Sequence, residues 1–88
     1  MAVSFKSHGQ LASVAAATPI PAVEVSGARR IEVVASGGDV RWKIGEDPTA
    51  AVGMLLEEKK IHVFEMGIAD LRFIDAGGTA VVDYTIYG

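Results

Sequence analysis

The segment Val40-Arg41-Trp42-Lys43-Ile44 alternates apolar and charged side chains without interruption. Alternation with a period of two is typical of a β-strand that has one buried and one solvated face. The residues before it, Ser36-Gly37-Gly38-Asp39, contain two glycines that can supply the positive φ angles of a hairpin turn. Before that turn, Arg29–Ala35 alternates in the same way. The sequence therefore predicts two strands joined by a tight turn, with Trp42 facing inward.

The same signals continue to the C-terminus, through Lys59–Glu65, Leu71–Phe73 and Thr79–Tyr87, with another glycine turn at Ala76-Gly77-Gly78. Six or seven short strands, spaced at about 8–12 residues, predict an all-β fold. We expect a small antiparallel β-sandwich or jelly-roll-like barrel, formed by residues 19–88 as a single domain. Its predicted core consists of Ile31, Val33, Trp42, Ile61, Val63, Leu71, Phe73, Val82 and Tyr84.

Two interpretations remain open for residues 47–60. Asp47-Pro48 has the pattern of a helix N-cap followed by proline at the first helical position, and Ala50–Lys60 contains several good helix formers. Gly53 lies in the middle of that helix and would destabilise it by about 1 kcal/mol. The alternative is a loop, a short strand over Met54–Leu56 and a charged turn at Glu57–Lys60.

Residues 1–18 are predicted to form an extended N-terminal arm or an edge strand. The apolar run Leu11–Ala17 is short and is interrupted by Ser13, which disfavours a signal peptide or a membrane span. The small Ala and Ser side chains offer little apolar area for burial. We therefore expect the domain to stay folded when residues 1–18 are removed.

Composition and charge exclude several classes of function. The chain has 88 residues, half of them apolar, with no cysteine and a net charge of −3. A net negative charge disfavours binding to nucleic acid or to a membrane surface. Arg29 and Arg30 are predicted to form a basic stripe with Arg41 and Lys43 on neighbouring strands, suited to docking on an acidic protein surface.

The sequence contains no pattern typical of a catalytic, cofactor-binding or metal-binding site. His8 and His62 have no spacing typical of metal ligands, and Glu57-Glu58 is followed at once by Lys59-Lys60, as in a solvated charged turn. The glycine pairs match neither a phosphate-binding loop nor a dinucleotide fingerprint. We expect no enzymatic activity, no cofactor and no small-molecule substrate.

The alternation also leaves apolar side chains on outward positions, namely Val34, Phe64, Val81 and Tyr87. A small sandwich that exposes such residues carries an apolar patch, and such patches usually mark interfaces. The alternative for Phe64 is a bulge that reverses the register of its strand. With Arg29 and Arg30, these residues are the candidate interface residues, and we expect a homo-oligomer, a trimer, with a dimer as the alternative that the sequence leaves open.

Residues Val40 to Tyr87 carry a further pattern, built from Val40-x-Trp42, Asp47-Pro48-Thr49-Ala50-x-x-Gly53-Met54-x-Leu56, Leu71-x-Phe73-Ile74 and Tyr84-x-x-Tyr87. In this pattern the chain resembles small phage and prophage virion proteins of the capsid decoration, or cement, type. Those proteins often have a glycine where this chain has Glu57–Lys60, and the N-terminal third has no counterpart. The resemblance favours the loop and strand over the helix in residues 47–56.

The resemblance implies a non-enzymatic protein that binds the major capsid protein on the outer surface of the head and stabilises the shell. Such a protein is made in the host cytoplasm and ends in the virion. The alternative is a small ligand- or carbohydrate-binding β-module of a tail or spike.

Overall fold

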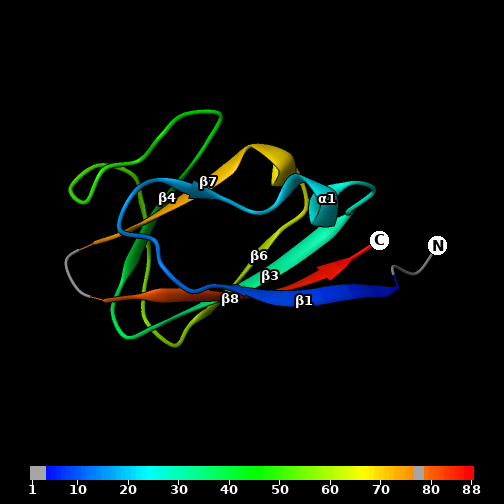
Figure 1. Ribbon diagram of the computed structural model, residues 1–88, viewed down its shortest axis with the longest axis horizontal. Helices are drawn as coiled ribbons and strands as arrows, with labels where there is room; N and C mark the ends of the chain where they lie inside the picture. The colour runs from blue at the N-terminus through cyan, green and yellow to red at the C-terminus, as the bar shows by residue number, and fades with distance from the viewer. Residues whose placement is uncertain (1–3, 77–78) are drawn as a thin grey trace.

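The computed structural model describes residues 4–76 and 79–88 and contains eight strands in two antiparallel sheets. The first sheet has the order β1-β8-β3-β6 and the second has the order β2-β7-β4-β5. Figure 1 shows them as two layers, with the short α1 near one end. The elements are β1 (Phe5–Leu11), β2 (Thr18–Pro19), α1 (Ala22–Val25), β3 (Arg30–Ser36), β4 (Val40–Ile44), β5 (Met54–Leu56), β6 (Ile61–Phe64), the 3-10 turn η1 (Ile68–Asp70), β7 (Leu71–Asp75) and β8 (Val81–Tyr87).

The strand pairs are nested along the chain. β1 pairs with β8, β2 with β7, β3 with β6 and β4 with β5, all antiparallel. The predicted all-β antiparallel sandwich is therefore confirmed. The Ser36–Asp39 turn differs from the prediction, because it joins β3 in one sheet to β4 in the other and is not a hairpin within a sheet.

The predicted turn at Gly77-Gly78 lies outside the described residues. In the part of the chain that the structure describes, no helix has the length and apolarity needed to cross a bilayer.

The core lies between the two sheets and follows the alternation of the central strands. In β3 and β8, every second residue is buried. Six of the predicted core residues are confirmed as buried: Ile31, Val33, Leu71, Phe73, Val82 and Tyr84. Trp42 is only partly buried and packs against this core from the side of β4.

The predicted orientation of β6 is wrong. Ile61 and Val63, predicted to be core residues, are 70% and 45% exposed, whereas Phe64 is 6% exposed. β6 pairs with β3 so that Phe64 lies opposite Ile31, and opposite residues in an antiparallel pair share a face. The Phe64 ring meets the Trp42 ring edge to face at 4.7 Å. Turning this ring inward buries more apolar surface than turning Ile61 inward would, because aromatic side chains are larger.

The N-terminal segment belongs to the sandwich from residue 4 onward. β1 pairs with β8 along nearly its whole length, from Phe5 opposite Tyr87 to Leu11 opposite Val82. Leu11 and Val14 are 7% and 1% exposed and are part of the core. Residues 5–11 therefore form an edge strand, as one of the two alternatives predicted. The other alternative, a loose arm, is wrong for the described residues because Leu11 and Val14 are buried in the core. Residues 1–3 lie outside the described part of the chain.

Residues 47–60 contain no helix, and β5 covers Met54–Leu56 as the loop-and-strand interpretation predicts. The loop is held by the Arg41 side chain, which donates hydrogen bonds to the carbonyl oxygens of Ala50 and Gly53. Gly53 has a φ of +141°, and a Cβ there would lie 3.1 Å from Pro48 and from the Trp42 carbonyl oxygen. Glycine is therefore required at the point where the loop turns back toward β4.

Candidate binding surface

The solvent face of the first sheet, which we call the outer face, combines apolar and polar side chains from four strands. Register and burial place on it Phe5, His8 and Gln10 from β1, Val81, Asp83, Thr85 and Tyr87 from β8, Arg30, Glu32, Val34 and Ser36 from β3, and Ile61 and Val63 from β6. Phe5, Ile61 and Val63 are exposed, while Val34, Val81 and Tyr87 are half-buried. The outer face thus carries separate apolar groups, Phe5 beside Tyr87 and Val34 beside Ile61, with polar and charged side chains between them.

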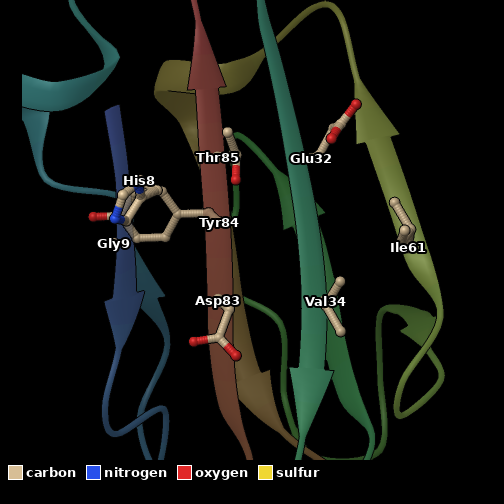
Figure 2. Close-up of a pocket in the computed structure, with 8 residues that line it drawn as sticks. All are labelled: His8, Gly9, Glu32, Val34, Ile61, Asp83, Tyr84 and Thr85. Atoms are coloured by element: carbon tan, nitrogen blue, oxygen red, sulfur yellow. The ribbon is translucent and has the colours of Figure 1, made fainter. Parts of the chain in front are cut away.

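A shallow hollow of about 400 Å³ lies in the outer face. Figure 2 shows its lining, with His8 and Gly9 on β1, Asp83, Tyr84 and Thr85 on β8, Glu32 and Val34 on β3, and Ile61 on β6. The hollow therefore spans the full width of the first sheet. Its volume is in the range of small-molecule sites, but it is open to solvent where most such sites enclose their ligand.

Hydrogen bonds between strands hold the two carboxylates of the hollow in place. Asp83 accepts hydrogen bonds from Gln10 Nε2 at 2.8 Å and from Ser36 Oγ at 3.5 Å. Glu32 accepts one from the Tyr87 hydroxyl at 3.3 Å. With their orientations restricted by neighbours, these carboxylates present fixed acceptors to a bound partner.

Beside the hollow, the Arg30 guanidinium lies over the ring of Tyr87, 4.7 Å from its centroid, in a cation–π contact. The structure therefore places two of the predicted interface residues against each other at one end of the outer face.

Under the hollow, Tyr84 passes beneath β1 on the core side of the sheet. A Cβ at Gly9 would lie 2.6 Å from the Tyr84 hydroxyl oxygen, so only glycine leaves room for this ring. The hydroxyl donates a hydrogen bond to Glu24 Oε2 on α1. Burial raises the pKa of Tyr84 to about 12, and the hydrogen bond to Glu24 and the charge of Glu24 act in the same direction.

We expect the absorbance of Tyr84 tyrosinate to develop near pH 12, against an ordinary value of 10.0. Because the folded state favours the neutral phenol, the associated stability is complete below pH 10 and is lost as the pH rises toward 12. Glu24→Gln should lower this pKa but leave it above the ordinary value, since burial remains. Tyr84→Phe should remove the transition. A transition of Tyr84 at its ordinary value would contradict the packing described.

The predicted interface residues fall into three groups. Val34, Val81, Tyr87 and Arg30 lie together on the outer face, and Arg29 is exposed immediately before β3. Phe64 is a core residue, so its assignment to the interface is wrong. Its neighbours Ile61 and Val63 are the exposed residues of β6. Sequence patterns did not identify Phe5, His8 and Asp83 as outer-face residues, because their strand partners are distant in sequence.

The predicted basic stripe is also wrong. Arg30 belongs to the first sheet, while Arg41 and Lys43 lie on β4 in the second sheet, so they face opposite sides of the molecule. Arg41 is occupied by loop carbonyl oxygens, and Lys43 forms an ion pair with Glu46 at 3.1 Å. No continuous basic surface joins these groups.

Over residues 4–76 and 79–88, no three His, Asp or Glu side chains gather in a way that could hold a metal ion. What the outer face provides is shape, apolar contact area and fixed hydrogen-bond acceptors. Such a surface can bind a partner without catalysing a reaction.

No protein-family model, curated protein or solved structure matches the chain.

Proposed function

We propose that this protein is a non-enzymatic capsid decoration protein that binds the major capsid protein on the outer surface of a phage head. The observation that carries this proposal is the apolar outer face, with Phe5 and Ile61 60% and 70% exposed around half-buried Val34, Val81 and Tyr87. Exposed apolar side chains on one face, here in two groups with polar residues between them, are typical of a docking surface for a protein. The resemblance of residues 40–87 to cement proteins supplies the identity of the partner.

The architecture supports the same proposal. The nested pairing of the eight described strands in two sheets supports the jelly-roll arrangement that we propose, an architecture used by viral capsid proteins and by lectins. Fold by itself does not determine function, so this agreement adds support only alongside the outer face.

In this proposal the protein stabilises the shell by many modest contacts. Apolar side chains of the outer face lose contact with water against the capsid, and Glu32 and Asp83 accept hydrogen bonds from it. An oligomer, proposed as a trimer because a trimer suits the threefold axes of a capsid, touches several shell subunits at once and gains avidity. The protein then resides on the virion surface and raises the barrier to rupture of the head.

The test is to add purified protein to heads that lack it and to measure their survival of heat or osmotic shock. We expect wild-type protein to bind and to increase survival. Val34→Asp places a charge in the middle of the outer face and should weaken binding by about 10-fold or more, since an unpaired charge would be desolvated.

Ile74→Asp is the matched control, because Ile74 is also half-buried but lies opposite Arg41 on the solvent face of the second sheet. This variant should bind as wild type does, provided that both variants melt at similar temperatures. Equal survival of heads with and without the protein would contradict the proposed function.

A second candidate function rests on the hollow in particular. Two oriented carboxylates and Thr85 beside the apolar Val34 and Ile61 form the mixed lining that suits a saccharide. In that case the protein is a carbohydrate-binding module of a tail or spike. Binding of glycans that is lost in Asp83→Ala, without binding to heads, would favour this candidate over decoration.

A further inference from the structure

Arg30 brings a positive charge to the outer face, and its guanidinium is held against an aromatic ring. The Arg30 Cζ atom lies 4.7 Å from the centroid of the Tyr87 ring. Arg30 is opposite Tyr87 in the pairing of β3 with β8, and Phe5 of β1 is opposite Tyr87 on the other side. These three side chains form one end of the outer face, which we call the arginine end.

The hydrogen-bond donors of Arg30 have no acceptor in the part of the chain that the structure describes. The Nε atom is buried without a hydrogen-bond partner, whereas the two Nη atoms are not enclosed in this way. The two ion pairs of the described residues both lie at the second sheet and do not involve Arg30. A charged donor that has lost contact with water and gained no acceptor is unusual in a folded protein, because the loss is not compensated.

The packing of Arg30 determines which edge of the guanidinium a ligand can reach. The Tyr87 ring covers one face, and the Nε edge is buried. The Nη edge remains, and its two N–H groups lie side by side in the plane of the guanidinium, as the two oxygens of a carboxylate require. Because stacking already restricts the side chain, an anion that binds here costs less ordering than it does at a free surface arginine.

The charges near Arg30 determine which class of anion fits. Glu32 lies two residues along β3 on the same face and adds a negative charge beside the site. Arg29 directly precedes Arg30, and successive side chains of an extended chain point to opposite faces. The Lys6 ammonium donates to the Ser26 carbonyl oxygen. One guanidinium balances the single charge of a carboxylate, whereas a phosphate dianion would leave a negative charge unbalanced beside Glu32.

We propose that the arginine end binds a carboxylate, which in the docked protein is an aspartate or glutamate side chain of the protein partner. The source of this carboxylate rests on the proposed function, but the site itself does not. The exposed Phe5 ring and the Tyr87 ring lie beside the site. They offer apolar contact to the methylene groups of an acidic side chain while its carboxylate meets the Nη groups of Arg30.

The site also restricts the direction in which a partner lies on the outer face. Glu32 and Asp83 line the hollow and repel a carboxylate from it. An acidic group of the partner is therefore attracted to the arginine end and excluded from the middle of the sheet. Attraction at one position and repulsion at another fix the register of a docked protein.

The first experiment follows the Nε–H signals of the arginine side chains by NMR spectroscopy of the ¹⁵N-labelled protein while sodium acetate is added. We expect the Arg30 signal to shift and to reach half-saturation at about 10–100 mM acetate, as for one charge-assisted pair of hydrogen bonds. Sodium chloride at the same ionic strength should not produce this shift, and phosphate should bind more weakly than acetate.

Arg30→Lys keeps the positive charge but lacks the planar pair of donors. This variant should lose the saturable acetate shifts of the Phe5 and Tyr87 backbone amides. Arg72→Lys is the matched control, because Arg72 is also half-buried but lies on the solvent face of the second sheet in an ion pair with Asp47. It should leave the response of Arg30 to acetate unchanged.

The second experiment measures binding of the same variants to heads that lack the protein. Arg30→Lys should bind about 10-fold or more weakly than wild type, and Arg72→Lys should bind as wild type does. Acetate binding at Arg30 in a protein that does not bind heads would uphold the carboxylate site and contradict the proposed function. An Arg30 signal that responds equally to chloride, tighter binding of phosphate than of acetate, or heads that bind Arg30→Lys as tightly as wild type would overturn the inference.

Discussion

Phe64→Ala should destabilise the domain by about 3–5 kcal/mol, whereas Val63→Ala should change its stability by no more than about 0.5 kcal/mol. The two residues are adjacent in sequence, but Phe64 is 6% exposed and Val63 is 45% exposed. Removing the Phe64 ring leaves a cavity against Trp42 and Ile31, while trimming Val63 on the solvent face leaves no enclosed cavity. For a domain with a total stability of about 5–15 kcal/mol, the first change is a large fraction of the whole.

Urea denaturation followed by Trp42 fluorescence and by circular dichroism measures both effects, and both should be measured at concentrations where the variants are monomeric. Phe73→Ala, at a fully buried position of β7, is the reference for loss of a core ring. A loss of stability in Val63→Ala larger than that in Phe64→Ala would show that β6 has the opposite orientation.

Removal of residues 1–14 should unfold the protein. The deletion takes away the whole of β1, and with it the core side chains Leu11 and Val14. β8, now an internal strand of the first sheet, would become an edge with unpaired backbone groups. Burial of two such side chains contributes about 3–6 kcal/mol, which is comparable to the stability of a small domain.

Circular dichroism and the dispersion of amide proton resonances measure this outcome. Two point variants test whether the effect comes from the lost core side chains or only from the shortening of the chain. Val14→Asp buries a charge and should be strongly destabilising, whereas Ala12→Asp lies at an exposed position and should be tolerated. A truncated chain with native dispersion would restore the view of residues 1–14 as a dispensable arm.

Strands with a clear alternation of apolar and polar residues could be predicted from the sequence alone. Alternation in Val40–Ile44 and in the C-terminal strand correctly predicted β4 and β8 and the inward residues Val82 and Tyr84. The β5 strand over Met54–Leu56 has the bounds of one of the two alternatives that the sequence left open for residues 47–60. These features depend on side-chain period and on the conformations open to glycine and proline, which are properties of neighbouring residues.

The candidate site depended on tertiary structure. The residues of the outer face come from four strands, and the contact between Arg30 and Tyr87 joins positions far apart in the chain. The basic residues Arg30 and Arg41 were expected together, but the turn between their strands crosses from one sheet to the other. Which strands become neighbours is decided by long-range pairing, and no local pattern encodes it.

The orientation of β6 shows the same division within a single strand. Alternation in Ile61-His62-Val63-Phe64 defines two faces, and each of them carries apolar side chains. Period alone establishes that a strand has two faces, but it does not say which of them is buried. That choice was made by the space between the sheets, where the Phe64 ring fits against Trp42 and leaves Ile61 and Val63 in solvent. The sequence by itself determined where the central strands β3, β4, β7 and β8 run, because their alternation is local, and packing between distant segments decided which surfaces the protein presents.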